Sequence, residues 1–103
     1  MENMTEKFAE FCEQLKYEDL SPEVIKRTKL LILDTVGIII RARHDAESTS
    51  SLVSAIDKLE MNNGSCQVFS DKKTYSPSAA ALLNGTLAHS LDFDDTHAEA
   101  SLH

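Results

Sequence analysis

Apolar residues recur at three- and four-residue spacing near the start of the chain, and this spacing predicts an amphipathic helix over residues 5–16. Residues 21–23 then place a hydroxyl N-cap, a proline and an acid in succession, which is a strong helix start. We expect this second helix to run over residues 22–42, with residues 41–45 as its charged exit turn. Residues 17–20 form the linker between the two helices.

The second half of that helix, from Leu30 to Ile40, is apolar nearly all round. A helix with this pattern is buried on most of its sides, yet a chain of 103 residues has little with which to cover it. We therefore expect the helix to pack against a partner or against further chain. The protein should form a homodimer or be only marginally stable alone.

The remaining chain predicts two more helices and little sheet. A third helix is expected over residues 46–59, and Asn62-Asn63-Gly64 predicts a turn. A short strand is expected at residues 66–69, followed by a polar loop over residues 70–75. Ser76-Pro77 repeats the helix start, and a fourth helix rich in small residues should span residues 77–90. The expected fold is all-α, with about four helices and at most one short strand pair, in a single domain.

Charge and cysteine content exclude several classes of protein. The net charge of −7 argues against binding to nucleic acid or to anionic membrane surfaces. The two cysteines, Cys12 and Cys66, stand in no metal-binding spacing, so we expect two reduced thiols in the core of a cytoplasmic protein. The polar residues 1–10 lack the apolar region of a signal peptide.

Chemically active side chains gather at the C-terminal end. Asp92, Asp94 and Asp95 stand almost side by side, with imidazoles at His97 and His103. Three interpretations remain open from the residues alone. The segment is a solvated acidic loop, a divalent-cation site in which His97 joins the carboxylates, or an acid/base site, because imidazoles titrate near neutrality. The other histidine of this region, His89, is expected to be a packed, hydrogen-bonded residue of the fourth helix.

Two segments carry a resemblance to a known family. Residues 33–37 read L-D-T-V-G, and residues 81–97 read A-L-L-N-G-T-L-A-H-S-L-D-F-D-D-T-H. They resemble the MmgE/PrpD motifs L-L-D-T-x-G and A-x-x-N-G-x-x-x-H-x-x-D-[FY]-D-D-T-H. The resemblance extends from about Phe8 to the end of the chain. It implies that residues 1–103 are the N-terminal part of the family's helical domain, without its α/β lid domain.

The family includes 2-methylcitrate dehydratase, cis-aconitate decarboxylase and iminodisuccinate epimerase, so the resemblance implies a lyase or isomerase of small di- or tricarboxylates. It implies His103, Asp92 and Thr96 as catalytic residues, and Asp92, Thr96 and His97 as substrate-binding residues. It implies no metal and no cofactor. The family's second histidine and two lysines lie further along than this chain extends. We therefore expect the isolated chain to be inactive. The alternatives are a non-catalytic helical oligomerisation module and a cation-binding acidic loop.

Overall fold

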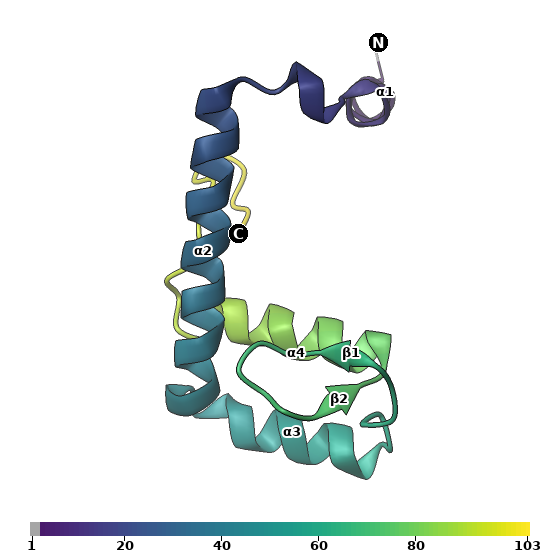
Figure 1. Cartoon of the computed structure of the whole chain (residues 1–103), viewed down its shortest axis with the longest axis vertical. Helices are drawn as coiled ribbons and strands as arrows, with labels where there is room; N and C mark the ends of the chain where they lie inside the picture. The colour runs from purple at the N-terminus through teal and green to yellow at the C-terminus, as the bar shows by residue number, and fades with distance from the viewer. Residues whose placement is uncertain (1–2) are drawn as a thin grey trace. The chain divides into compact units, whose positions relative to one another are not determined.

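The computed structural model describes residues 3–103 (Figure 1). The chain divides into two compact units, Met1–Leu30 and Leu31–His103. The first unit contains helix α1 (Met4–Gln14) and a single 3₁₀ turn, η1 (Tyr17–Asp19). Helix α2 (Pro22–Asp45) begins in the first unit and continues into the second.

The first unit has no core of its own. No side chain among residues 3–30 is buried, and the apolar side of α1 is open, with Phe8 68% and Phe11 58% exposed. Cys12 is exposed too, so the expectation of a core thiol is wrong at this position. The periodicity predicted the helix correctly, but no second layer within these residues covers its apolar face.

The second unit joins the end of α2 to helix α3 (Ser48–Lys58), strands β1 (Cys66–Gln67) and β2 (Thr74–Tyr75), and helix α4 (Pro77–His89). The strands pair antiparallel, and α4 contacts both of them as well as α3 (Figure 1). The prediction of an all-α fold, with about four helices and at most one short strand pair, is confirmed over residues 3–103, which are mainly helical and contain four α-helices and one two-stranded sheet. The second strand occupies part of the segment that the sequence predicted as polar loop.

Helix α2 continues past the predicted exit turn and ends at Asp45. Arg41 and Asp45 form an ion pair one helical turn apart, which supports continued helix. Arg43 and His44 place basic side chains in the last turn, where they complement the helix dipole. The charged residues that suggested a turn therefore stabilise the helix end.

The core of the second unit lies between these elements. Its buried members are Ile39, Ala42, Ile56, Val68, Tyr75, Ala79, Ala80, Leu83 and Leu87. Cys66 packs against this core and is partly buried, as expected for a structural thiol. Thr49 Oγ1 donates a hydrogen bond of 3.0 Å to the carbonyl of Ala42 and ties α3 to α2.

Asn84 fastens the strand region to α4. Its side-chain amide donates to the Gln67 carbonyl at 3.1 Å, and its oxygen accepts from the Phe69 N–H at 3.1 Å. The two bonds satisfy backbone groups at the last residue of β1 and just beyond it, where a strand of only two residues leaves them without ladder partners. The asparagine of the N-G motif therefore has a structural role.

One polar network lies at the edge of the core. The carboxylate of Asp71 accepts from Tyr75 Oη at 2.7 Å and from Arg43 at 3.2 Å, and it also accepts from the Lys73 N–H. Burial acts to raise the pKa of Asp71, but these bonds outweigh burial and leave that pKa below its ordinary value. Burial, followed by the bond to Asp71, raises the pKa of Tyr75 to about 12.

The apolar stretch of α2 is buried on one side only. Ile38 and Ile39 are buried, whereas Ile32 is 59% and Leu33 69% exposed. The expectation of burial on most sides is not met within this chain, because α3 and α4 cover only the last turns of the helix. Within residues 3–103, no helix has both the length and the apolar character needed to cross a membrane.

Candidate active site

Helix α4 carries the first half of the motif. It begins with Ser76 as N-cap, whose Oγ accepts from the Ala79 N–H at 3.3 Å, and with Pro77 in its first turn. It ends at His89. Asp92 adopts a left-handed conformation with φ 57°, which aspartate tolerates, and its N–H donates to the His89 carbonyl at 2.9 Å. The chain therefore turns sharply where the acidic segment begins.

A small hairpin brings the end of the chain back to this turn. The His97 N–H donates to the Leu102 carbonyl at 2.8 Å, and the Leu102 N–H donates to the His97 carbonyl at 3.3 Å. Ser101, at φ 50°, closes the loop in a left-handed conformation. His103 directly follows this bridge, so the hairpin places its ring beside the acidic segment.

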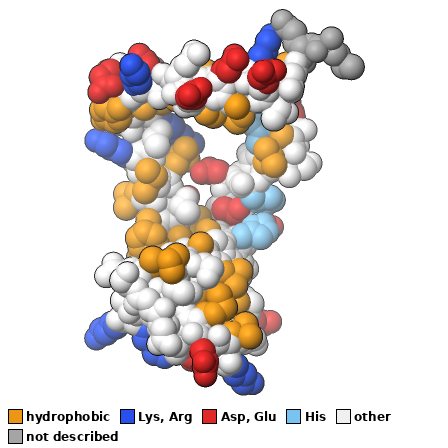
Figure 2. Space-filling model, turned by 90° about the vertical axis from the view of Figure 1, so that its right-hand side faces the viewer, with side chains coloured by type: hydrophobic (Ala, Val, Ile, Leu, Met, Phe, Trp, Pro, Cys, Tyr) orange, Lys and Arg blue, Asp and Glu red, His pale blue; other side chains and the backbone are white. Residues whose placement is uncertain are grey.

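The result is one carboxylate shared by two imidazoles. His89 Nδ1 lies 3.0 Å from Asp94 Oδ1 and 3.2 Å from Oδ2, and His103 Nδ1 lies 3.1 Å from Asp94 Oδ2. The two rings meet edge to face, with their centroids 4.5 Å apart. Figure 2 shows imidazole and carboxylate side chains side by side on the surface.

Asp94 is the least exposed member of this group, with 14% of its side chain accessible against 58% for His89 and 44% for His103. The hydrogen bond with His89 lowers the pKa of Asp94 below its ordinary value. Burial opposes this effect, and the bond with His103 adds to it. An ionised carboxylate can only accept, so both Nδ1 atoms donate, and a ring in its neutral form then has its lone pair on Nε2. Each imidazole is thereby oriented to act as a base through its outer nitrogen.

The same group satisfies the distance requirement of a metal site. One potential ligand atom each from His89, Asp92, Asp94 and His103 lies within 4.8 Å of the others. The cation site considered from the sequence has different members, because it includes Asp95 and His97 as ligands. The fold replaces them with His89 and His103.

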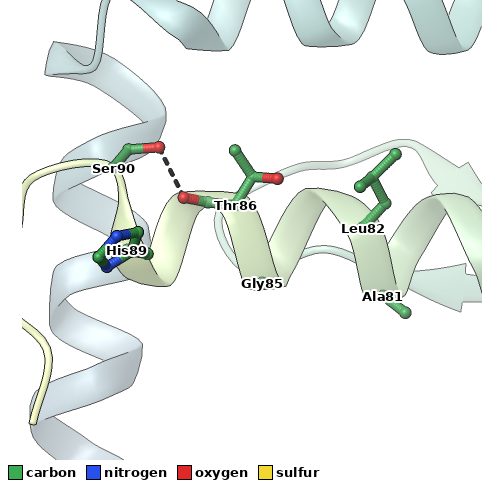
Figure 3. A pocket seen from close by; sticks show the side chains of 6 residues that line it. All are labelled: Ala81, Leu82, Gly85, Thr86, His89 and Ser90. Carbon is green, nitrogen blue, oxygen red and sulfur yellow. Dashed lines mark hydrogen bonds between the residues drawn. The ribbon is translucent and has the colours of Figure 1, made fainter. Parts of the chain in front are cut away.

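A hollow of about 480 Å³ runs along α4 next to His89. It is lined by Ala81, Leu82, Gly85, Thr86, His89 and Ser90. Figure 3 shows Ala81 and Leu82 at one end and His89 and Ser90 at the other, with Ser90 Oγ bonded to the Thr86 carbonyl at 2.6 Å. The hollow is largely open to solvent and its lining comes from α4 and its C-cap residue alone, and the imidazole of His89 stands at its edge.

The predicted site residues fall into two groups. Asp92 and His103 lie together in the cluster. Thr96 is exposed, and His97 is not a member of the cluster but accepts the Ala100 N–H on its Nδ1 at 3.2 Å within the hairpin. The catalytic and substrate-binding roles of Asp92, Thr96, His97 and His103 stay predictions.

Sequence reasoning named Asp94 among the acidic residues but did not place it at the centre of the cluster, and it missed His89 as a member. His89 was expected to be a packed helix residue, but it is exposed and bonded to Asp94. The sequence signal for this pair was the separation of five residues between His89 and Asp94 across the end of α4. That separation indicates contact only once the left-handed turn at Asp92 is known.

Cations are lacking from this region of the chain. Residues 74–103 carry four carboxylates and no Lys or Arg. Recognition of a di- or tricarboxylate requires positive charge or several hydrogen-bond donors. Residues 74–103 therefore offer imidazoles and carboxylates but no Lys or Arg side chain that could pair with an anionic ligand.

Comparison with known proteins agrees with the motifs. The MmgE/PrpD N-terminal domain matches residues 6–103. The cis-aconitate decarboxylase-like protein oryM of Aspergillus oryzae is 34% identical over 101 residues, which are 98% of this chain and 20% of that protein. Human cis-aconitate decarboxylase is 34% identical over 97 residues, 93% of this chain and 20% of the relative. No solved structure matches the chain significantly.

The chain thus spans about one fifth of the length of these curated relatives. The match covers the helices, the strand pair and the histidine–aspartate cluster alike. On this basis the chain belongs to the MmgE/PrpD family, and it corresponds to that family's N-terminal domain.

Proposed function

We propose that this chain is the N-terminal portion of a lyase or isomerase that acts on small di- or tricarboxylates by acid/base chemistry. Decarboxylation of a cis-aconitate-like substrate is the first candidate, because several relatives bear the name cis-aconitate decarboxylase. Dehydration of a 2-methylcitrate-like substrate and epimerisation are the other candidates within the family. No cofactor and no metal is part of this proposal.

The observation that carries the proposal is the position of His103 beside Asp94. In our proposal His103 moves the proton through Nε2, while Asp94 holds Nδ1 and fixes the orientation of the ring. Asp92 and Thr96 orient the substrate or the imidazole, and His97 contributes to substrate binding. The hollow along α4 adjoins this group and offers room for part of a small acid.

In this proposal, the active site is formed jointly by this chain and by the remaining part of a full-length protein. The groups here transfer protons, whereas cations from the remaining four fifths of a full-length protein hold the carboxylates and balance the developing negative charge. The isolated chain is therefore inactive. The exposed apolar side of α2 supports a homodimer, or contact with further chain, as its partner. The two free cysteines support a cytoplasmic location.

A chimera tests the function directly. This chain replaces the matching N-terminal fifth of Aspergillus terreus cis-aconitate decarboxylase, to which it is 30% identical over 101 residues. The folded chimera should release CO2 from cis-aconitate. His103→Ala should lower turnover by about 10²–10⁴-fold, the usual contribution of a general acid or base. His44→Ala, in the exposed last turn of α2, should leave turnover unchanged.

Circular dichroism and gel filtration would establish that each chimera is folded before its activity is compared. Equal effects of the two substitutions would contradict the role of His103. A folded chimera without activity on cis-aconitate, 2-methylcitrate or an epimerisable dicarboxylate would contradict the proposed function. Turnover by the 103-residue chain alone would contradict the proposal that cations from the rest of a full-length protein are needed to complete the site.

The non-catalytic alternative, a helical oligomerisation module, makes a different prediction. Its only support is the exposed apolar side of α2, and it gives no role to the hydrogen-bonded cluster. In that case both histidine substitutions would be neutral, and substitution of Leu33 would abolish self-association.

A further inference from the structure

We propose that His89, Asp94 and His103 form a chelating site for a borderline-soft divalent cation of the Zn²⁺ type. This inference goes beyond the proposed reaction, which needs no metal. It rests on the geometry, the donor types and the charge of the cluster, so its test does not depend on enzymatic activity.

The distances within the cluster are close to those of a metal coordination shell. Zn²⁺ binds imidazole nitrogen and carboxylate oxygen at about 2.0–2.2 Å, so neighbouring ligands of a tetrahedral site lie about 3.4 Å apart. The three nitrogen–oxygen distances around Asp94 are 3.0, 3.1 and 3.2 Å. Separation by a few tenths of an ångström would bring these nitrogen–oxygen pairs to that spacing, and the four potential ligand atoms of the group lie within 4.8 Å of one another.

The donor types select the class of cation. Imidazole suits Zn²⁺ and related transition metals, whereas Mg²⁺ and Ca²⁺ prefer oxygen ligands. Asp92 has a carboxylate in the same group and is available as the fourth ligand. Two neutral imidazoles and two carboxylates around one divalent ion give a site with no net charge. The proton on each Nδ1 moves to Nε2 when the metal binds, so each ring stays neutral.

The charge around the cluster also favours a cation. Residues 74–103 contain the carboxylates of Asp92, Asp94, Asp95 and Glu99 and no basic Lys or Arg side chain to balance them. A bound cation would relieve the repulsion among the three neighbouring aspartates. It would also join the end of α4, the acidic segment and the residue after the hairpin into one unit. Metal binding should therefore stabilise the second unit.

The test is a titration of the 103-residue chain, first freed of metal with EDTA. Calorimetry with ZnCl₂ at neutral pH should show binding of about one ion per chain, and the thermal midpoint should rise and fall back when EDTA is added. MgCl₂ at the same concentration should leave the midpoint unchanged. Nitrogen NMR of the imidazoles should show Zn²⁺-dependent shifts at His89 and His103 and none at His44.

Substitutions then identify the ligands. His89→Ala, His103→Ala and Asp94→Asn should each weaken Zn²⁺ binding by at least about tenfold, the loss that even an outer-shell group causes. The matched controls are His44→Ala and Asp95→Asn, which remove the same groups from exposed positions outside the cluster. They should bind as wild type does.

Three results would overturn the inference. They are absence of Zn²⁺ binding by the wild-type chain, an equal response to Mg²⁺, and an equal loss of affinity in the cluster variants and the controls. The NMR measurement needs no substitution, so a variant that fails to fold does not prevent a decision.

Discussion

Adding a single methyl group at Gly64 should destabilise the second unit more than the same change at any other glycine of the chain. A Cβ built at Gly64 would lie 2.2 Å from the carbonyl oxygen of Tyr75 and 2.8 Å from the Cα of Ser76. Ordinary contacts to a Cβ begin at about 3.4 Å, so the backbone would have to move by roughly 1 Å. These atoms cannot rotate away as a side chain could, because they belong to the backbone that leads into α4.

The magnitude follows from what that movement breaks. Overpacking in a close-packed region costs about 1–3 kcal/mol. The Ser76 N–H also donates to the Met61 carbonyl at 3.0 Å, and loss of that bond adds about 1 kcal/mol. We therefore expect Gly64→Ala to lower the free energy of unfolding by about 2–4 kcal/mol. For a domain of this size each kcal/mol corresponds to a fall of about 4–8 °C in the thermal midpoint.

The assay is thermal and urea denaturation followed by circular dichroism, with the other two glycines as matched controls. Gly37 and Gly85 lie inside α2 and α4, and a Cβ at either position meets no other atom within 4 Å. Alanine there should stabilise the helix by about 0.5–1 kcal/mol. If Gly64→Ala melts at the wild-type temperature, or if all three variants shift alike, close backbone approach is not the reason for glycine at position 64.

Further predictions concern the core and its polar edge. Leu83→Ala should destabilise the chain by about 2–5 kcal/mol, because Leu83 is fully buried, whereas the neighbouring Leu82→Ala, at 49% exposed, should change stability by about 0.5 kcal/mol or less in the same urea titration. Because the pKa of Asp71 is lower in the folded chain than in the unfolded one, its contribution to stability is present above about pH 4 and is lost as pH falls through the folded value. Tyr75→Phe removes a hydrogen bond that lowers the pKa of Asp71. The variant should therefore lose less stability than wild type when the solution is acidified. If the unfolding free energies of the two proteins fall by the same amount between neutral and acidic pH, this linkage is disproved.

The hollow along α4 shows how residue pattern and tertiary structure differ in what they determine. The small residues of that helix, Gly85 among them, would permit a second helix to approach closely. In the structure Gly85 instead lines an open hollow, and a Cβ there would meet nothing within 4 Å. The composition of a helix face indicates how closely something can approach it. It does not identify what approaches.

Local signals in the sequence determined the elements of this fold. Helix starts at Ser21-Pro22 and Ser76-Pro77, and apolar spacing in α1, depend on capping and periodicity within a few residues, and the structure has helices at these places. The motif from Ala81 to His97 was likewise sufficient to recognise the MmgE/PrpD family. Both kinds of signal consist of residues close together in the sequence, so they can be recognised without knowing which distant residues are in contact.

The tertiary structure alone decided which side chains meet. Three features brought both His89 and His103 to the carboxylate of Asp94: the end of α4, the left-handed turn at Asp92, and the bridge between His97 and Leu102. None of these distances follows from residue spacing, because backbone conformation at a few loop positions sets them. Burial likewise depends on tertiary structure. Cys12 and Leu33 have apolar side chains, yet both are exposed because no second layer covers their helices at these positions. Pairing and burial are properties of packing, and packing depends on the whole arrangement of elements rather than on any one segment.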